Sequence, residues 1–213
     1  MTPRGDLLCR RIRATGPISI ADYMNECLLH RLVVRTGNKQ LVPVHRLDKE
    51  TAGLVLFSKR PETRRNYFGL FEGRQIEKQY EAIATLPEEP DRKSWLVESR
   101  IEPSGEWILC HNVPGEINAR SRIEMLESSG DHARFALSPI TGKTHQLRLH
   151  MGLIGSQIRY DRFYPQLQPE SEVVDYNRPL QLLAKRLAFT DPLSGIRHLF
   201  ESQRRLAVWQ STD

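Results

Sequence analysis

The loop written VHRLDKETAG, residues 44–53, holds the residues best suited to chemistry. It joins a strand-like segment to the apolar run 54–57, and charged loops that end a strand commonly display side chains to a ligand. Asp48 lies between Arg46 and Lys49, whose positive charges favour an ionised carboxylate. Nucleophilic and general-base chemistry both need that form. Asp is also a common turn and capping residue, so local pattern alone leaves a structural role for Asp48 open.

A second cluster, TGKTHQLRLH at residues 141–150, places basic and amide side chains just after a glycine turn. At a helix N-terminus such a turn suits phosphate groups. On a helix, Thr144 and Arg148 share one face while Leu147 and His150 share another. Arg148 can then point at a carboxylate while His150 packs inward. A basic surface helix is the alternative interpretation.

Two other chemistries are excluded for this cluster. Gly142-Lys143-Thr144 copies the end of a phosphate-binding P-loop, but Leu137 stands where that pattern requires its first glycine. His145 and His150 have the wrong spacing for an HExxH zinc site and no glutamate lies between them. The three cysteines, Cys9, Cys27 and Cys110, form no CxxC pair. We therefore expect no metal site, and a reducing cytoplasm as the compartment.

These clusters, together with Lys78-Gln79-Tyr80, resemble in order and spacing the motifs of the RluA-type pseudouridine synthase family. The family's catalytic loop has HRLD followed by a small residue and glycine, as His45 to Asp48 and Thr51 to Gly53 have here. Its K-x-Y strand and its TGRTHQ(I/L)R(V/L)HM segment are matched by 78–80 and 141–151. Residues 160–164, YDRFY, resemble the GDxxY that follows. The resemblance runs from about residue 23 to about residue 206.

The resemblance implies an enzyme that isomerises uridine to pseudouridine in RNA. Asp48 would be the catalytic aspartate, Tyr80 the aromatic residue that packs on the target base, and Arg148 the basic partner of Asp48. The implied substrate-binding residues are His45, Arg46 and Lys143. Arg46 would fill the space left by the extruded base, and Lys143 would contact a phosphate. A carboxylate can perform this isomerisation, so the resemblance implies no cofactor.

The implied partner is a structured RNA, either ribosomal or transfer RNA. The formal net charge of +5 and the pI of about 9.3 are compatible with a polyanion, although many other proteins share them. No apolar run approaches the roughly 18 residues of a membrane span. We therefore expect no binding to a membrane. We also expect the protein to be a monomer. A catalytically silent RNA-binding protein with the same fold is the main alternative. A glycoside hydrolase would need a second carboxylate, for which Glu50 is the nearby candidate.

Periodicity and turn residues predict an α+β fold, a mostly antiparallel mixed sheet with flanking helices, as in the pseudouridine synthase catalytic fold. Helices are predicted at 21–34, from Pro61 to before Gly73, and at 145–154, and strands at 54–57, 75–84, 120–126, 133–139, 186–190 and 196–200. Family members normally have two strands around a Lys-Pro-x-Gly turn before the catalytic loop, and often a small RNA-binding domain. Neither is visible here. We therefore divide the chain into an atypical N-terminal segment, 1–22, and a catalytic domain, 23–213.

Overall fold

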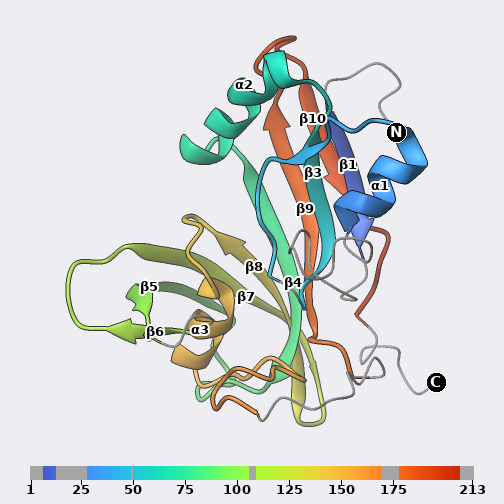
Figure 1. Ribbon diagram of the computed structural model, residues 1–213. Coiled ribbons are helices and arrows are strands. Elements are labelled where there is room, and N and C mark those ends of the chain that lie inside the picture. The colour runs from blue at the N-terminus through green and yellow to red at the C-terminus, as the bar shows by residue number, and fades with distance from the viewer. Residues whose placement is uncertain (1–6, 13–27, 49, 106–108, 169–177, 207–213) are drawn as a thin grey trace. The chain divides into compact units, whose positions relative to one another are not determined.

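The computed structural model describes residues 7–12, 28–48, 50–105, 109–168 and 178–206. The chain divides into two compact units, the first made of Met1–Lys78 and Ala184–Arg204, the second of Gln79–Leu183 and Arg205–Asp213. It passes from the first unit to the second within strand β4 (Glu77–Thr85) and returns within β9 (Leu182–Thr190) (Figure 1).

The sheet of the first unit is built around β3 (Ala52–Ser58), which lies between β1 (Leu7–Ile12) and β9. The short strand β2 (Val42–Pro43) pairs with the end of β3, and β10 (Arg197–Glu201) pairs with β9. The pairs of β3 with β1 and β2, and of β9 with β10, are antiparallel. β1 pairs with β3 along its length from Gly53 to Ser58.

Two helices cover opposite faces of this sheet, because the side chains of β3 are apolar on both sides. Leu54 and Leu56 pack with α2 (Pro61–Glu72), whereas Val55 and Phe57 pack with α1 (Leu28–Thr36). Alternate residues of a strand point to opposite faces, so the run Leu-Val-Leu-Phe is buried on both faces of the sheet. β3 is thus held from both sides at the point where the VHRLDKETAG loop ends.

The second unit is an antiparallel sheet with the strand order β4-β8-β7-β5-β6. Its strands beyond β4 are β5 (Ser94–Pro103), β6 (Cys110–Val113), β7 (Ala119–Ser129) and β8 (His132–Pro139). One face of β4, β5, β7 and β8 forms a hydrophobic core with Leu147 and Met151 of helix α3 (Gln146–Leu153). α3 therefore packs against one face of this sheet.

The predicted α+β class with a mostly antiparallel sheet is confirmed, as are the helix after Pro61 and the strands at 54–57, 75–84, 120–126 and 133–139. The helix predicted from residue 145 begins at Gln146, with His145 as its N-cap. The helix predicted at 21–34 is observed from Leu28 to Thr36, and residues 21–27 lie outside the described part. β2 lies in the strand-like segment expected before the HRLD loop, whereas β1, β5 and β6 are not among the predicted strands, and β1 lies within the segment 1–22.

Candidate active site

The HRLD loop leaves the sheet of the first unit at His45. The side chain of His45 accepts a hydrogen bond that a backbone carbonyl of the neighbouring strand would otherwise accept. The N–H of Val44 donates to the carbonyl of Leu56 at 3.0 Å, as an antiparallel ladder requires. The N–H of Leu56 donates in turn to Nε2 of His45, also at 3.0 Å. An imidazole thus satisfies a buried strand N–H at the place where the loop turns away.

His45 is neutral in this position and its tautomer is determined by its partners. Since Nε2 accepts from Leu56, the ring hydrogen is on Nδ1, which donates to the carbonyl of Arg46 at 3.2 Å. The ring also stacks on Phe71 of α2, with centroids 4.6 Å apart. Burial lowers the pKa of His45 to about 4, the hydrogen bond to Arg46 opposes this, and the positive charge of Lys78 adds to it.

The residues that follow His45 differ in how far they are buried. Leu47 packs into the hydrophobic cluster beneath α1, while the side chain of Arg46 is exposed. Asp48 is half-buried between this anchor and a turn closed by a hydrogen bond from the N–H of Thr51 to the carbonyl of Asp48, at 3.0 Å. The loop therefore holds the backbone of Asp48 on both sides.

Gly53 completes the loop where the chain enters β3. Its φ is +122°, in the region that favours glycine, and a Cβ here would lie 2.3 Å from the carbonyl oxygen of Ala184 in β9. The residue after Thr51-Ala52 must therefore be glycine for β3 and β9 to approach each other as they do.

The K-x-Y strand is β4. Lys78 belongs to the first unit and is half-buried, and desolvation, with the nearby charge of Arg74, lowers its pKa. Tyr80 belongs to the second unit, where it is half-buried, pairs with Leu137 of β8 and packs against the same core as Leu147 and Met151 of α3. Tyr80 and α3 therefore share one face of the second sheet.

Gln146 holds the turn of the TGKTHQ segment. Its Oε1 accepts from Oγ1 of Thr141 (2.7 Å) and from the backbone N–H of Lys143 (3.0 Å). Its Nε2 donates to the carbonyl of Arg120 and to Oγ of Ser121, both at 2.8 Å. The turn is thereby fastened to β7, and the side chain of Lys143 stays exposed on it.

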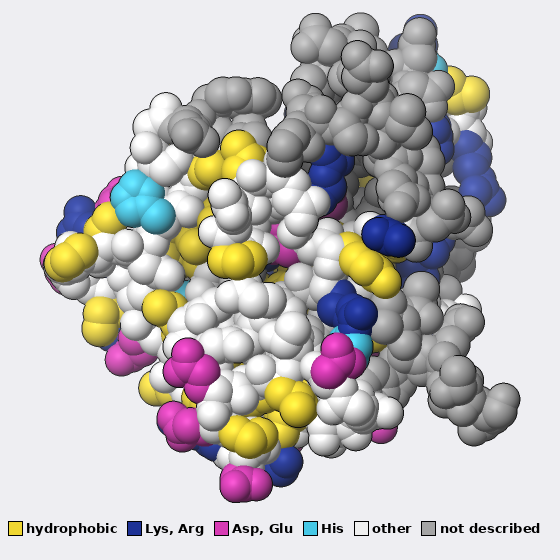
Figure 2. All heavy atoms as spheres, turned by 90° about the horizontal axis from the view of Figure 1, so that it is seen from below, with side chains coloured by type: hydrophobic (Ala, Val, Ile, Leu, Met, Phe, Trp, Pro, Cys, Tyr) yellow, Lys and Arg dark blue, Asp and Glu magenta, His cyan; other side chains and the backbone are white. Residues whose placement is uncertain are grey.

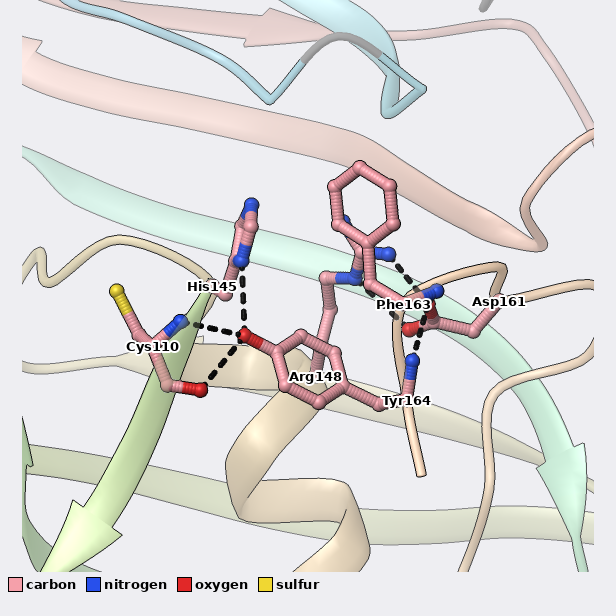
Figure 3. A network of polar contacts seen from close by, with 6 residues as sticks. All are labelled: Cys110, His145, Arg148, Asp161, Phe163 and Tyr164. Atoms are coloured by element: carbon pink, nitrogen blue, oxygen red, sulfur yellow. Dashed lines mark hydrogen bonds and ion pairs between the residues drawn. The ribbon is translucent and has the colours of Figure 1, made fainter. Parts of the chain in front are cut away.

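Arg148 is buried and forms a forked ion pair with Asp161. Nε of Arg148 lies 2.8 Å from Oδ2 of Asp161, and Nη2 contacts Oδ1. The rings of Phe163 and Tyr164 lie 4.6 and 5.3 Å from the guanidinium carbon (Figure 3). Asp161 also accepts from the backbone N–H groups of Phe163 (2.8 Å) and Tyr164 (3.1 Å), so segment 161–164 wraps around the cation.

The predicted site residues thus fall into both units. His45, Arg46 and Asp48 lie in the first, and Tyr80, Lys143 and Arg148 in the second, where Tyr80 and α3 share a sheet face. Their roles in catalysis and binding stay predictions, including the pairing of Arg148 with Asp48. The sequence pattern assigns no role to Asp161, although its place in the YDRFY motif, residues 160–164, is a signal that could have found it.

Among the described residues, no group of three or more His, Cys, Asp or Glu side chains is arranged to hold a metal ion. None of the described helices is long and apolar enough to cross a membrane. On the face in Figure 2, hydrophobic, acidic and basic side chains are interspersed over the described residues.

The sequence matches the family described as RNA pseudouridylate synthase over residues 12–152, well over half of the chain. The chain belongs to the RNA pseudouridylate synthase family. It is 31% identical over 201 residues to the dual-specificity RNA pseudouridine synthase RluA of Escherichia coli K12, covering 89% of this chain and 86% of the relative. It is 35% identical over 156 residues to an uncharacterized RNA pseudouridine synthase of Haemophilus influenzae, covering 72% of this chain and 68% of the relative.

The fold is similar to that of a solved structure, human RNA pseudouridylate synthase domain containing 4. The TM-score is 0.73 at 22% sequence identity, over 95% of this chain and 87% of the other. This likeness supports the fold, while the sequence relatives support the activity. As a pseudouridine synthase, the chain is an isomerase that modifies RNA, which confirms the predicted family and enzyme class.

Proposed function

We propose that this pseudouridine synthase acts on ribosomal or transfer RNA, with Asp48 as the carboxylate that performs the chemistry. One observation carries the assignment of Asp48. It is half-buried in a loop held on one side by His45 on Leu56 and by Leu47 in the core, and on the other by the Thr51 turn. Restricting a reactive group in this way raises the rate of a reaction whose geometry it matches.

The reaction breaks the bond from ribose C1′ to uracil N1, turns the base, and joins C1′ to C5. C5 then loses its proton to solvent, and N1 takes one up. Asp48 would attack C1′, with the bonding electrons passing to the uracil, or would remove a ribose proton. In the first route C5 then displaces the carboxylate. Both routes need an ionised Asp48 and regenerate it at the end.

A uridine stacked within an RNA helix is out of reach, so it must be extruded, at a cost of a few kcal/mol. Tyr80 would stack on the extruded base and Arg46, exposed on the loop, would fill the space it leaves. Lys143, exposed on the turn that Gln146 fastens, would contact a phosphate. The cation of Arg148 would favour the charged form of Asp48.

The test is tritium release from RNA transcribed with 5-tritiated uridine. Ribosomal and transfer RNA are supplied separately to the wild type and to Asp48→Asn, an isosteric change that removes the charge. We expect release from at least one RNA with the wild type and a loss of about a thousandfold or more in the variant. Equal release from both proteins would refute the role of Asp48.

RNA binding without release by the wild type would favour the catalytically silent alternative, whereas release of free uracil would favour the hydrolase. Carbodiimide-dependent primer extension, in cells with and without the protein, would locate the modified uridine. Action in the cytoplasm as a monomer is part of the same proposal. Fractionation and analytical ultracentrifugation test those two points.

A further inference from the structure

The hydroxyl of Tyr164 lies at the centre of polar contacts that the proposed chemistry leaves without a role (Figure 3). It lies 3.0 Å from the backbone nitrogen of Cys110, 2.9 Å from the carbonyl oxygen of Cys110, and 2.9 Å from Nδ1 of His145. These contacts join β6, the start of α3 and the segment that wraps Arg148.

The hydrogen positions follow from what each group can do. The Cys110 N–H only donates and its carbonyl only accepts, so the phenol accepts from the first and gives its own hydrogen to the second. Cys110 is opposite Pro103 in the ladder, next to the pair in which the N–H of Ser104 donates to the carbonyl of Leu109 at 3.0 Å, so the N–H and carbonyl of Cys110 point away from β5 and toward Tyr164. With its single hydrogen used, the phenol can only accept from His145. Neutral His145 therefore carries its hydrogen on Nδ1.

His145 itself stands in an uncommon position. It is buried, it is the N-cap of α3, and its φ of +55° lies in the left-handed region. A residue other than glycine keeps a left-handed conformation where the surrounding contacts enforce it. Its ring packs against those of Phe163 and Tyr164, with centroids 5.4 and 5.6 Å away. The same two rings lie on the guanidinium of Arg148, one turn further along α3.

We propose that the Tyr164 hydroxyl is a positioning group for the active site, which anchors segment 161–164 to β6 and holds His145 in its Nδ1-protonated tautomer. Through that anchor, Asp161 and the rings of Phe163 and Tyr164 keep the Arg148 guanidinium in one place. Burial raises the pKa of Tyr164 to about 12, so the phenol stays a donor at neutral pH. The expected effect on catalysis rests on the proposed function, whereas the expected tautomer of His145 does not.

The test uses Tyr164→Phe, which removes the hydroxyl and keeps the ring on Arg148. The matched control is Tyr160→Phe, the same change four residues earlier in the YDRFY motif. Two-bond ¹H–¹⁵N spectra of histidine-labelled protein report the tautomer of each imidazole, and a His145→Gln variant assigns the signal. We expect Nδ1-protonated His145 in the wild type and in the control, and loss of that single tautomer in Tyr164→Phe.

The kinetic arm is tritium release measured well below the melting temperature. We expect kcat to fall about tenfold in Tyr164→Phe with KM changed by less than about twofold, because the cation is displaced rather than removed. An unchanged kcat, or a loss confined to KM or to thermal stability, would overturn the positioning role. An Nε2-protonated His145 in the wild type would overturn it as well. A wild type without tritium release would refute the proposed function alone, since the spectra need no RNA.

Discussion

The imidazole of His45 accepts the backbone N–H of Leu56 at 3.0 Å, where an antiparallel strand would ordinarily offer a carbonyl. The HRLD loop therefore turns away from the pairing with β3 without leaving that buried N–H unsatisfied. A residue of the HRLD motif thus has a structural task that is separate from contact with RNA.

Replacing His45 by Phe should show the size of this task. The Phe ring can keep the stack on Phe71 but leaves the N–H of Leu56 without its acceptor, so we expect the free energy of unfolding to fall by about 1–3 kcal/mol. His45→Gln, whose amide oxygen can accept, should recover part of the loss. Urea denaturation measures both variants. Equal stability of the Phe variant and the wild type would show that the hydrogen bond contributes nothing.

His150 should make the stability of the protein depend on pH. It is fully buried, with Nε2 3.1 Å from Oγ of Ser99, and burial lowers its pKa from 6.5 to about 4. Below pH 6.5 the unfolded chain takes up a proton that the folded protein resists, so stability falls as the pH decreases and levels off below about pH 4. The change amounts to about 3 kcal/mol from this group.

The measurement is urea denaturation of the wild type and of His150→Gln at intervals from pH 7 to pH 4. The variant should have the shallower pH dependence by that amount. Parallel curves for the two proteins would rule out His150 as the source, and His45 would then be examined in the same way.

Gly53 and Gly69 offer a matched pair of alanine substitutions in the first unit. Gly53→Ala places a Cβ 2.3 Å from the carbonyl oxygen of Ala184 at a φ of +122°, so we expect a loss of at least about 2 kcal/mol in stability. Gly69 lies within α2 with nothing within 4 Å of its Cβ position, and Gly69→Ala should stabilise by about 0.5–1 kcal/mol. Thermal unfolding of both variants checks the opposite signs, and similar shifts would contradict the close approach.

Asp161→Asn should destabilise the second unit strongly. It removes the negative charge that balances buried Arg148, and breaking one partner of a buried pair costs about 3–5 kcal/mol. Glu89→Gln is the control, since its ion pair with Arg92 is exposed and should contribute less than about 1 kcal/mol. Chemical denaturation compares the two. Losses of equal size would mean that the Arg148 fork is not a buried charge pair in solution.

Lys143→Ala should weaken RNA binding without slowing the chemical step. Loss of one phosphate contact is expected to raise Kd several-fold and to reduce the slope of log affinity against log salt by about one. Because its side chain is exposed, the fold should be unaffected, and kcat at saturating RNA should be retained. Lys93→Ala carries the same charge change on the loop before β5 and should leave the slope unchanged. A lower kcat in Lys143→Ala would point to a role other than phosphate contact.

Local pattern was sufficient for several parts of the fold. The run Leu54 to Phe57 is apolar on both faces and was recognisable as a buried strand, and Pro61 and Gly73 mark the limits of α2. The pattern does not predict β5, although Trp95 and Val97 alternate with exposed residues, because the charges that follow interrupt the alternation. β1 is not predicted either, since its pairing with β3 spans more than forty residues and no local feature identifies the partner of a strand.

The sequence by itself determined the family and the identity of the candidate residues, because motif order, residue type and spacing are all properties of the chain. Only the tertiary structure decided what holds them. His45 meets Leu56 through the pairing of β2 with β3, Arg148 meets Asp161 through the turn after α3, and Tyr164 meets Cys110 from 54 positions away. Each contact needs strands and loops to be folded together first, and spacing along a chain does not encode distance between atoms.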